Sequence, residues 1–219
     1  QKTSMKLLLI GIGPGIGMAV ARRFGRAGFE ILMIARDADK LKHYEQELAG
    51  EGIRSRGFAV DIADETAYSE LLTRLAADHP DLDILHYNAS AYNPAPPSAI
   101  SLPVFHQDFQ INTVGALIAA QAFLPAMKTR GAGTIFLTGG GSALNAPPEL
   151  ISLSIGKAGM RNLALALAEE CAPLGIRVAT VTVHGMVQPG TKHDPDLIAA
   201  EFHRLYQLPQ GAWEREVNL

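Results

Sequence analysis

Residues 7–17 constrain the fold most, because a run of apolar residues is followed at once by a glycine-rich turn. The apolar run 7–10 is typical of a parallel strand that is buried on both faces. Four glycines then let the backbone turn tightly and let a ligand approach it closely: Gly11, Gly13, Gly15 and Gly17. Apolar residues next recur every fourth position, as on one face of a helix: Ile16, Val20 and Phe24. The segment therefore predicts a strand, a tight turn and the start of a helix.

A helix that begins in this turn directs free N–H groups and the positive end of its dipole toward the turn, which favours an anion there. We therefore expect the turn to hold the pyrophosphate of a dinucleotide through Gly11, Gly13, Gly15, Ile16 and Gly17. The alternative is a glycine-rich turn that only permits tight packing. The spacing is G-x-x-x-G-x-G rather than the strict G-x-G-x-x-G fingerprint.

Apolar segments alternate with helical patterns along the rest of the chain. We expect further strands at residues 29–35, 54–60, 82–87, 134–138 and 176–183, and a short edge strand at 213–217. Asp37, Asp64 and Asp194 are expected to cap helices. The alternation predicts an α/β fold in which a parallel sheet of six to seven strands has helices on both faces. We expect one domain over residues 1–219, with 1–4 as an added remnant ahead of Met5.

Composition limits the partners and the setting. The formal net charge is −3 and no basic run is present, so we expect no nucleic acid partner. The single cysteine, Cys171, excludes an internal disulfide and is consistent with a reducing, cytoplasmic setting. Its apolar helical surroundings favour a packed core thiol over a nucleophile. No signal peptide and no unbroken apolar stretch of about 18 residues is found, so we expect no membrane partner.

Three expected strand ends carry candidate cofactor contacts. Arg36 follows strand 29–35, where a cation suits a 2′-phosphate and favours NADP over NAD; the alternative is a solvated arginine. Asp61 can accept a hydrogen bond from an adenine amino group while Ile62 packs on the ring, or Asp61 can simply begin the next turn. Asn88 and Ala89 follow strand 82–87, at the edge where open α/β sheets bind ligands. The proline-rich loop 92–97 is expected over or beside this site.

Two polar residues lie within apolar helical patterns. Asn112 must be hydrogen-bonded if it is buried, so it either makes structural bonds or holds a water molecule. Lys157 lies on an otherwise apolar helix face, where the alternative to a functional role is a lysine that extends its amine to solvent. The seven histidines show no paired metal spacing, so no metal site is expected.

Taken together, these motifs resemble the classical short-chain dehydrogenase/reductase family. Gly11, Gly15 and Gly17 match its T-G-x-x-x-G-x-G motif, with Ile10 in the usual Thr place. The other matching residues are Arg36, Asp61 with Ile62, the Tyr87–Ser90 segment against N-N-A-G, Asn112, and Lys157 of Y-x-x-x-K. The resemblance implies a Rossmann-like doubly wound fold and NAD(P)-dependent oxidoreduction. It also implies that Lys157 bonds the nicotinamide ribose hydroxyls and that Gly185 and Val187, after the strand 176–183, contact the cofactor.

The same alignment reveals two losses. Leu153 occupies the place of the family's catalytic Tyr, and Gly140 that of its Ser. In the family the Lys lowers the pKa of that Tyr, which then exchanges a proton while hydride moves, and a leucine cannot do this. We consider Ser142 the first substitute proton donor. His184, Tyr87 and Tyr92 are further candidates, each with a purely structural role as the alternative.

Two functions follow from these residues. The first is an NADP-dependent reductase of a small carbonyl or conjugated compound with a non-standard proton donor, and Lys157, Asn112 and Ser142 as its catalytic group. A branch of the family that reduces enoyl thioesters also lacks the Tyr and keeps the Lys. The second is a catalytically silent NADP-binding sensor or assembly subunit. The apolar helices near 116–127 and 163–172 predict a homodimer or homotetramer.

Overall fold

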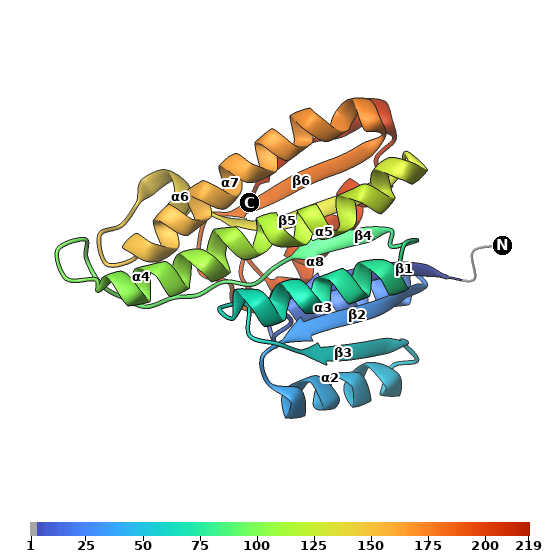
Figure 1. The fold of residues 1–219 in the computed structure, drawn as a ribbon, viewed down its shortest axis with the longest axis horizontal. Coiled ribbons are helices and arrows are strands. Elements are labelled where there is room, and N and C mark those ends of the chain that lie inside the picture. The colour runs from blue at the N-terminus through green and yellow to red at the C-terminus, as the bar shows by residue number, and fades with distance from the viewer. Residues whose placement is uncertain (1–3) are drawn as a thin grey trace.

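A computed structural model describes residues 4–219. The expectation that residues 1–4 are an added remnant therefore falls, for residues 1–3, outside the described residues. Its core is a seven-stranded sheet in the order β3-β2-β1-β4-β5-β6-β7 (Figure 1). The strands are β1 (Met5–Ile10), β2 (Phe29–Ala35), β3 (Ser55–Ala59), β4 (Ile84–Tyr87), β5 (Gly133–Gly140), β6 (Ile176–Val183) and β7 (Glu216–Asn218). Every neighbouring pair is parallel. The predicted doubly wound parallel sheet is confirmed.

Side chains of each strand alternate between two apolar layers. One layer contains Leu8, Ile10, Leu32, Ile34, Leu85 and Ile135. The other contains Leu7, Leu9, Ile31, Met33, Ile84 and Phe136. Because both faces are covered, the strands are continuously apolar instead of alternating between apolar and polar residues.

Helices cover both faces of the sheet. The first layer is covered by α3 (Glu65–Asp78), α5 (Gly115–Arg130) and α7 (Ile151–Cys171), which lie in front of the sheet in Figure 1. The helix α4 (Leu102–Phe109) packs against α7. The second is covered by α1 (Ile16–Arg26), α2 (Ala38–Gly50) and α8 (Pro195–Gln207). The remaining short helical segments are η1 (Gln110–Val114), α6 (Ser142–Asn145), η2 (Ala172–Leu174) and η3 (Gln210–Ala212).

The expected N-caps are confirmed. The Asp37 carboxylate accepts from the amides of two residues in the first turn of α2, and Asp64 and Asp194 each accept from one amide of α3 and α8. These acidic side chains also lie at the positive ends of the helix dipoles. Cys171 is fully buried and free, as expected for a core thiol, and burial raises its pKa.

The helical segment 102–130 changes from α-helical to π-helical hydrogen bonding in its middle and then returns to α-helical. The π-helical η1 joins α4 to α5 and contains Asn112. This segment is, among residues 4–219, the one helix long and apolar enough to cross a membrane. Core helices meet the same criterion, and in this fold Ala119, Phe123 and Met127 are buried against the sheet.

Candidate functional site

A cleft of about 920 Å³ runs along the carboxyl edge of the sheet. It is lined from the glycine turn after β1 and from the ends of β2 to β6, with α4, η1 and α7 closing one end. Every position expected to contact a nucleotide lines it: Gly11, Gly13, Gly15, Ile16, Gly17, Arg36, Asp61, Ile62, Asn88, Ala89, Lys157, Gly185 and Val187. Residues far apart in the sequence therefore meet in one continuous cleft.

The glycines of the turn fall into two groups, which differ in what an added side chain would meet. Gly11 has a φ of +89°, and a Cβ there would lie 2.4 Å from the amide nitrogen of Ala89. A Cβ at Gly17 would lie 2.9 Å from the Cα of Ile12. By contrast, a Cβ at Gly13 or Gly15 would meet nothing within 4 Å. Two glycines are thus required by the fold, and the other two leave open space in front of α1, whose N-terminus has no side-chain cap.

A chain of hydrogen bonds joins the turn to β4 and β5. Asn88 Nδ2 donates to the Gly11 carbonyl at 2.9 Å, and Thr138 Oγ1 donates to Asn88 Oδ1 at 2.8 Å. His86 Nε2 lies 2.9 Å from Thr138 Oγ1. Since the hydroxyl proton of Thr138 is given to Asn88, His86 must carry its proton on Nε2 and donate it. Burial lowers the pKa of His86 to about 3, so this ring stays neutral and the chain of bonds does not titrate near neutral pH.

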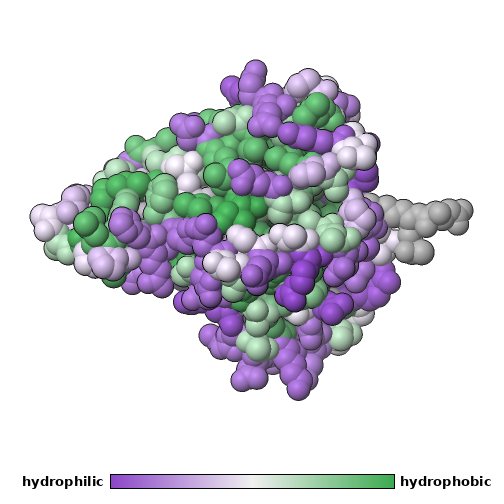
Figure 2. Space-filling model, in the orientation of Figure 1, coloured by the Kyte–Doolittle hydropathy of each residue, from purple (hydrophilic) through white to green (hydrophobic). Residues whose placement is uncertain are grey.

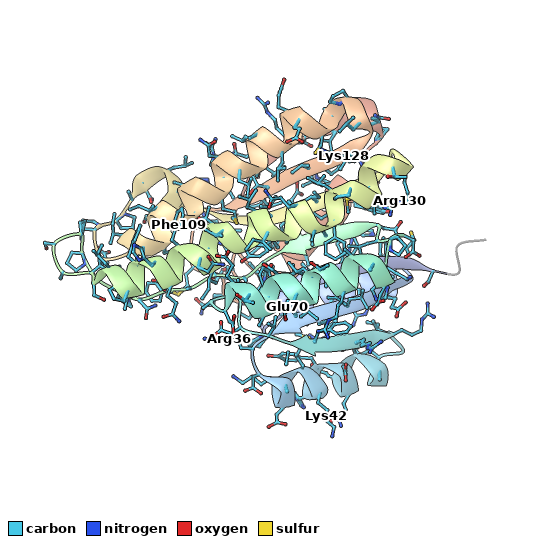
Figure 3. All side chains as sticks on the ribbon, in the orientation of Figure 1. Arg36, Lys42, Glu70, Phe109, Lys128 and Arg130 are labelled. Atoms are coloured by element: carbon cyan, nitrogen blue, oxygen red, sulfur yellow. The ribbon has the colours of Figure 1, made fainter. Side chains whose placement is uncertain are left out.

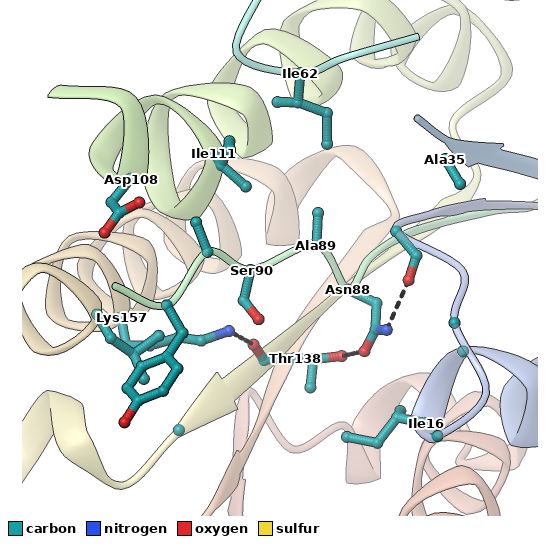
Figure 4. Close-up of a pocket in the computed structure, with 18 of the residues that line it drawn as sticks. Ile16, Ala35, Ile62, Asn88, Ala89, Ser90, Asp108, Ile111, Thr138 and Lys157 are labelled. Carbon is teal, nitrogen blue, oxygen red and sulfur yellow. Dashed lines mark hydrogen bonds between the residues drawn. The ribbon is translucent and has the colours of Figure 1, made fainter. Parts of the chain in front are cut away.

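Lys157 projects from α7 into the floor of the cleft. Its amine donates to the carbonyl oxygen of Thr138 at 2.9 Å, and the residue is only 7% exposed. Figure 4 shows this bond beside the one from Thr138 to Asn88. The expected alternative, an amine extended to solvent, is therefore wrong. Burial lowers the pKa of Lys157 to about 8, and no carboxylate among residues 4–219 forms an ion pair with it.

The opposite end of the cleft contains Arg36, Asp61 and Ile62. Arg36 is exposed at the end of β2 (Figure 3), and within residues 4–219 its guanidinium has no ion-pair partner. Asp61 Oδ1 accepts from the amide of Ala63 at 2.9 Å, so this carboxylate does begin the turn before α3 while it also lines the cleft. Ile62 is buried behind it.

Two predicted catalytic residues, Asn112 and Ser142, are not among the residues that line the cleft. Asn112 is fully buried, and its amide makes a reciprocal pair with Ala91: Oδ1 accepts from the backbone N–H at 2.8 Å, and Nδ2 donates to the carbonyl at 3.1 Å. The structural bonding expected as one alternative is thus present, and it fixes the loop after β4. Ser142 begins the short α6, half-buried.

The prediction of Tyr87 as a candidate proton donor is wrong. It is 1% exposed, its hydroxyl donates to the Ile111 carbonyl, and burial raises its pKa. His184 is exposed outside the cleft, with Nε2 2.7 Å from Asn218 Oδ1. Tyr92 does line the cleft and is 57% exposed.

Leu153 and Gly140 lie beside Lys157 at the same end of the cleft. Leu153 lies four residues before Lys157 on α7, and both line the cleft with Gly140. A Cβ at Gly140 would lie 3.6 Å from Lys157 Cγ and 3.8 Å from Ser142 Oγ. Beside Lys157, the wall therefore includes a leucine side chain and a bare backbone.

Sequence reasoning missed several lining residues, above all Thr138 and Asp108. Thr138 ends the apolar run 134–138, and its position near the end of β5 could have marked it as a lining residue. Its place at the centre of the hydrogen-bond network leaves no periodic signal. Asp108 gave a signal that could have been used, because a carboxylate is unusual on the buried side of a helix. No group of three His, Cys, Asp or Glu residues that could hold a metal ion is found within residues 4–219.

Comparison with known proteins identifies similar chains. A family model described as short chain dehydrogenase matches residues 6–196. The chain is 31% identical over 182 residues to the very-long-chain 3-oxoacyl-CoA reductase of Aspergillus clavatus, covering 81% of this chain and 52% of that protein. It is 28% identical over 205 residues to the D-threitol dehydrogenase of Mycolicibacterium smegmatis, covering 93% and 74%. The chain thus spans about half the length of the first of these relatives.

Solved structures share the whole architecture. A metagenomic short-chain oxidoreductase in complex with NADP superposes with a TM-score of 0.88 at 25% identity, covering 98% of this chain and 96% of that one. A short-chain dehydrogenase from Rhodopseudomonas palustris gives 0.87 at 25% identity, covering 98% and 97%.

Proposed function

The chain belongs to the short-chain dehydrogenase family, and from that premise we propose that it is an NADP-dependent oxidoreductase acting on a small organic substrate. One observation carries the proposal: the cleft is continuous from the exposed Arg36, past the open glycine turn, to the buried amine of Lys157. A cation suits a 2′-phosphate at one end, and a hydrogen-bond donor suits the ribose hydroxyls at the other.

The residues fit a dinucleotide. Space in front of Gly13 and Gly15 admits a pyrophosphate, and the uncapped N-terminus of α1 favours its charge. Arg36 would hold the 2′-phosphate, Asp61 and Ile62 the adenine. Gly185 and Val187 would contact the nicotinamide end. The preference for NADP over NAD rests on Arg36 alone.

Each polar group of the chain has a definite task in this proposal. When bound, the nicotinamide donates hydride to a substrate carbon or accepts it from one. Lys157 would hold the ribose hydroxyls, and its partner Thr138 keeps the amine at the cleft floor. The neutral His86, Thr138 and Asn88 hold the glycine turn against the ends of β4 and β5. Asn112 supports the loop through Ala91.

The proton must come from a group other than the family's Tyr and Ser, since Leu153 and Gly140 occupy those places. In carbonyl reduction, hydride adds to carbon and a proton must reach the oxygen; in reduction of a conjugated double bond, the proton must reach the carbon next to the activating group. Ser142 is the proposed donor: it does not itself line the cleft, but its Oγ lies 3.8 Å from where a Cβ on the cleft-lining Gly140 would be. Losing a positioned acid typically costs 10²–10⁴-fold in rate, which slows hydride transfer without abolishing it.

NADPH oxidation over a panel of ketones, enones and enoyl thioesters tests the proposal. We expect turnover of at least one class, abolished in Lys157→Ala and reduced in Ser142→Ala. Turnover that is unchanged in Ser142→Ala would exclude this serine as the donor. Saturable NADPH binding with no turnover of any class would instead favour the second candidate, a silent NADP-binding sensor or assembly subunit. That candidate is supported by Leu153 and Gly140.

We further propose a cytoplasmic homodimer or homotetramer. Figure 2 shows apolar residues gathered over the face that carries α5 and α7. Leu117 on α5 and Ile155 on α7 are 39% and 41% exposed, which fits helices that meet a second subunit. Light scattering that returned only monomer would contradict this assembly.

A further inference from the structure

Asp108 is a buried carboxylate that the proposed function has not used. Within α4 (Leu102–Phe109) it is the only buried residue, at 1% exposure. Its Oδ2 accepts from Ser152 Oγ at 2.6 Å, and its Oδ1 accepts from Asn93 Nδ2 at 2.7 Å. Among residues 4–219 no cation forms an ion pair with it. Both side-chain contacts are donations to the carboxylate, which is how an ionised group is held.

Asp108 lines the cleft at its substrate end. Figure 4 shows Asp108 and Lys157 at one end of the cleft, and Ile16 and Ala35 at the other. Asp108 and Lys157 carry opposite charges on α4 and α7, yet they form no ion pair, so they face the cleft separately. Ser152, which donates to Asp108, directly precedes Leu153 in the wall.

Asp108 lines the cleft, and its carboxylate has acceptor capacity beyond the two hydrogen bonds that it makes. A carboxylate has about four acceptor positions, and Ser152 and Asn93 each fill one of them. Burial of a charged group is costly unless its hydrogen bonds are made, so a further donor from a bound molecule would be favoured. An acceptor or an anionic group in the same place would be repelled, and a hydrocarbon would leave the carboxylate without that donor.

We propose that Asp108 accepts a hydrogen bond from a hydroxyl group on the substrate, next to the carbon that exchanges hydride. This inference rests on the proposed function and specifies its substrate class: polyols and the corresponding hydroxy ketones. Asp108 is then a specificity-determining residue, held in place by Ser152 and Asn93. A ketone without a neighbouring hydroxyl group, or an acyl chain, is disfavoured at this position.

Matched substrates test the inference directly. We would compare butane-2,3-diol with butan-2-ol for NADP⁺ reduction, and 3-hydroxybutan-2-one with butan-2-one for NADPH oxidation. The hydroxylated member should have a kcat/KM roughly 10- to 100-fold higher in the wild-type protein, because a site built to bond a hydroxyl rejects analogues without it. Asp108→Asn should reduce that ratio to about 3-fold or less, with NADPH affinity unchanged.

Control variants separate recognition from a structural role. Glu70→Gln removes an exposed carboxylate on α3 and should leave the preference as in the wild type. Ser152→Ala removes one donor to Asp108 but keeps the carboxylate, so most of the preference should remain. A carboxylate near the first turn of α7 also stabilises that helix, and such a role alone would lower the melting temperature of Asp108→Asn without changing the substrate ratio.

The outcomes are distinct. Equal kcat/KM for both members of each pair, or a preference that survives in Asp108→Asn, overturns the inference and leaves the proposed function standing. If the wild type turns over no substrate, binding of each pair to the NADP⁺-loaded protein is measured by thermal shift. A hydroxyl preference in binding, lost in Asp108→Asn, supports the role of Asp108 while the proposed oxidoreduction fails. Failure of NADP⁺ or NADPH to bind at all overturns both.

Discussion

Replacement of Lys157 by methionine should make the protein more stable and inactive. The amine is buried, has one hydrogen bond to the Thr138 carbonyl, and forms no ion pair within residues 4–219. Burial lowers the pKa of Lys157 from 10.5 to about 8. Each pH unit corresponds to about 1.4 kcal/mol, so keeping the amine charged in the folded state costs roughly 3 kcal/mol at pH 7.

Methionine removes this cost together with the hydrogen bond. A hydrogen bond that involves a charged group contributes about 1.5–3 kcal/mol, so the net gain for Lys157→Met at pH 7 is roughly 1 kcal/mol. A change of that size raises the melting temperature of a chain of this length by about 2–4 °C. The gain should be accompanied by loss of turnover, because the proposed donor to the ribose hydroxyls is removed.

The pH dependence identifies the cause. Between about pH 8 and 10.5 the folded lysine has lost its proton while the unfolded one retains it. The unfolded state then binds more protons, and the free energy of unfolding of the wild type rises with pH. The advantage of Lys157→Met is therefore constant below about pH 8 and shrinks above it.

Urea denaturation of both proteins from pH 6 to 9.5 measures this difference, and the shared groups cancel in the subtraction. A variant destabilised by more than about 1 kcal/mol at pH 7, or a difference that does not change with pH, would refute the reasoning about a buried, uncompensated cation.

Three other variants test the structure and the chemistry of the cleft. Gly11→Ala, at a positive φ and against the backbone after β4, should lower the free energy of unfolding by roughly 2–5 kcal/mol in urea titration; a change below about 1 kcal/mol would contradict the contact. Thr138→Val leaves the Nε2–H of His86 without an acceptor, so it should cost about 1–3 kcal/mol and weaken NADPH binding by fluorescence titration; unchanged stability would refute the assigned proton position. Leu153→Tyr combined with Gly140→Ser should raise kcat/KM for ketones by roughly 100-fold; no increase would mean that the wall beside the lysine is not where the proton is delivered.

The sequence predicted the sheet well, because its signals are local. Uninterrupted apolar strands, aspartate caps such as Asp37, and the glycine turn all reflect rules that act within a few residues. The carboxyl ends of parallel strands share one edge, so the cofactor contacts expected at Arg36, Asp61 and Asn88 had to meet. The cleft follows from strand order, which the alternation of elements already constrains.

The end of the cleft at Lys157 was predicted less well, because its contacts are made between elements. Nothing in the sequence indicates that the Asn112 side chain hydrogen-bonds the backbone of Ala91. Nor does it indicate that Tyr87 is buried and donates its hydroxyl proton to a backbone carbonyl. Lys157 is turned inward only because the Thr138 carbonyl lies within reach. The Asp108 carboxylate is held by a hydrogen bond from Ser152, which lies 44 positions away in the sequence. Such pairings arise from packing and have no local pattern.

The central claim is that the cleft holds NADP(H) with the 2′-phosphate at Arg36. Fluorescence titration of the wild type and of Arg36→Ala with NADPH and NADH measures it directly. We expect saturable binding in which the wild type prefers NADPH by roughly 10-fold or more, as is typical of a charge-assisted contact. Arg36→Ala should lose that preference while NADH affinity is unchanged. Equal affinities of the wild type for the two nucleotides, or binding of neither, would contradict it.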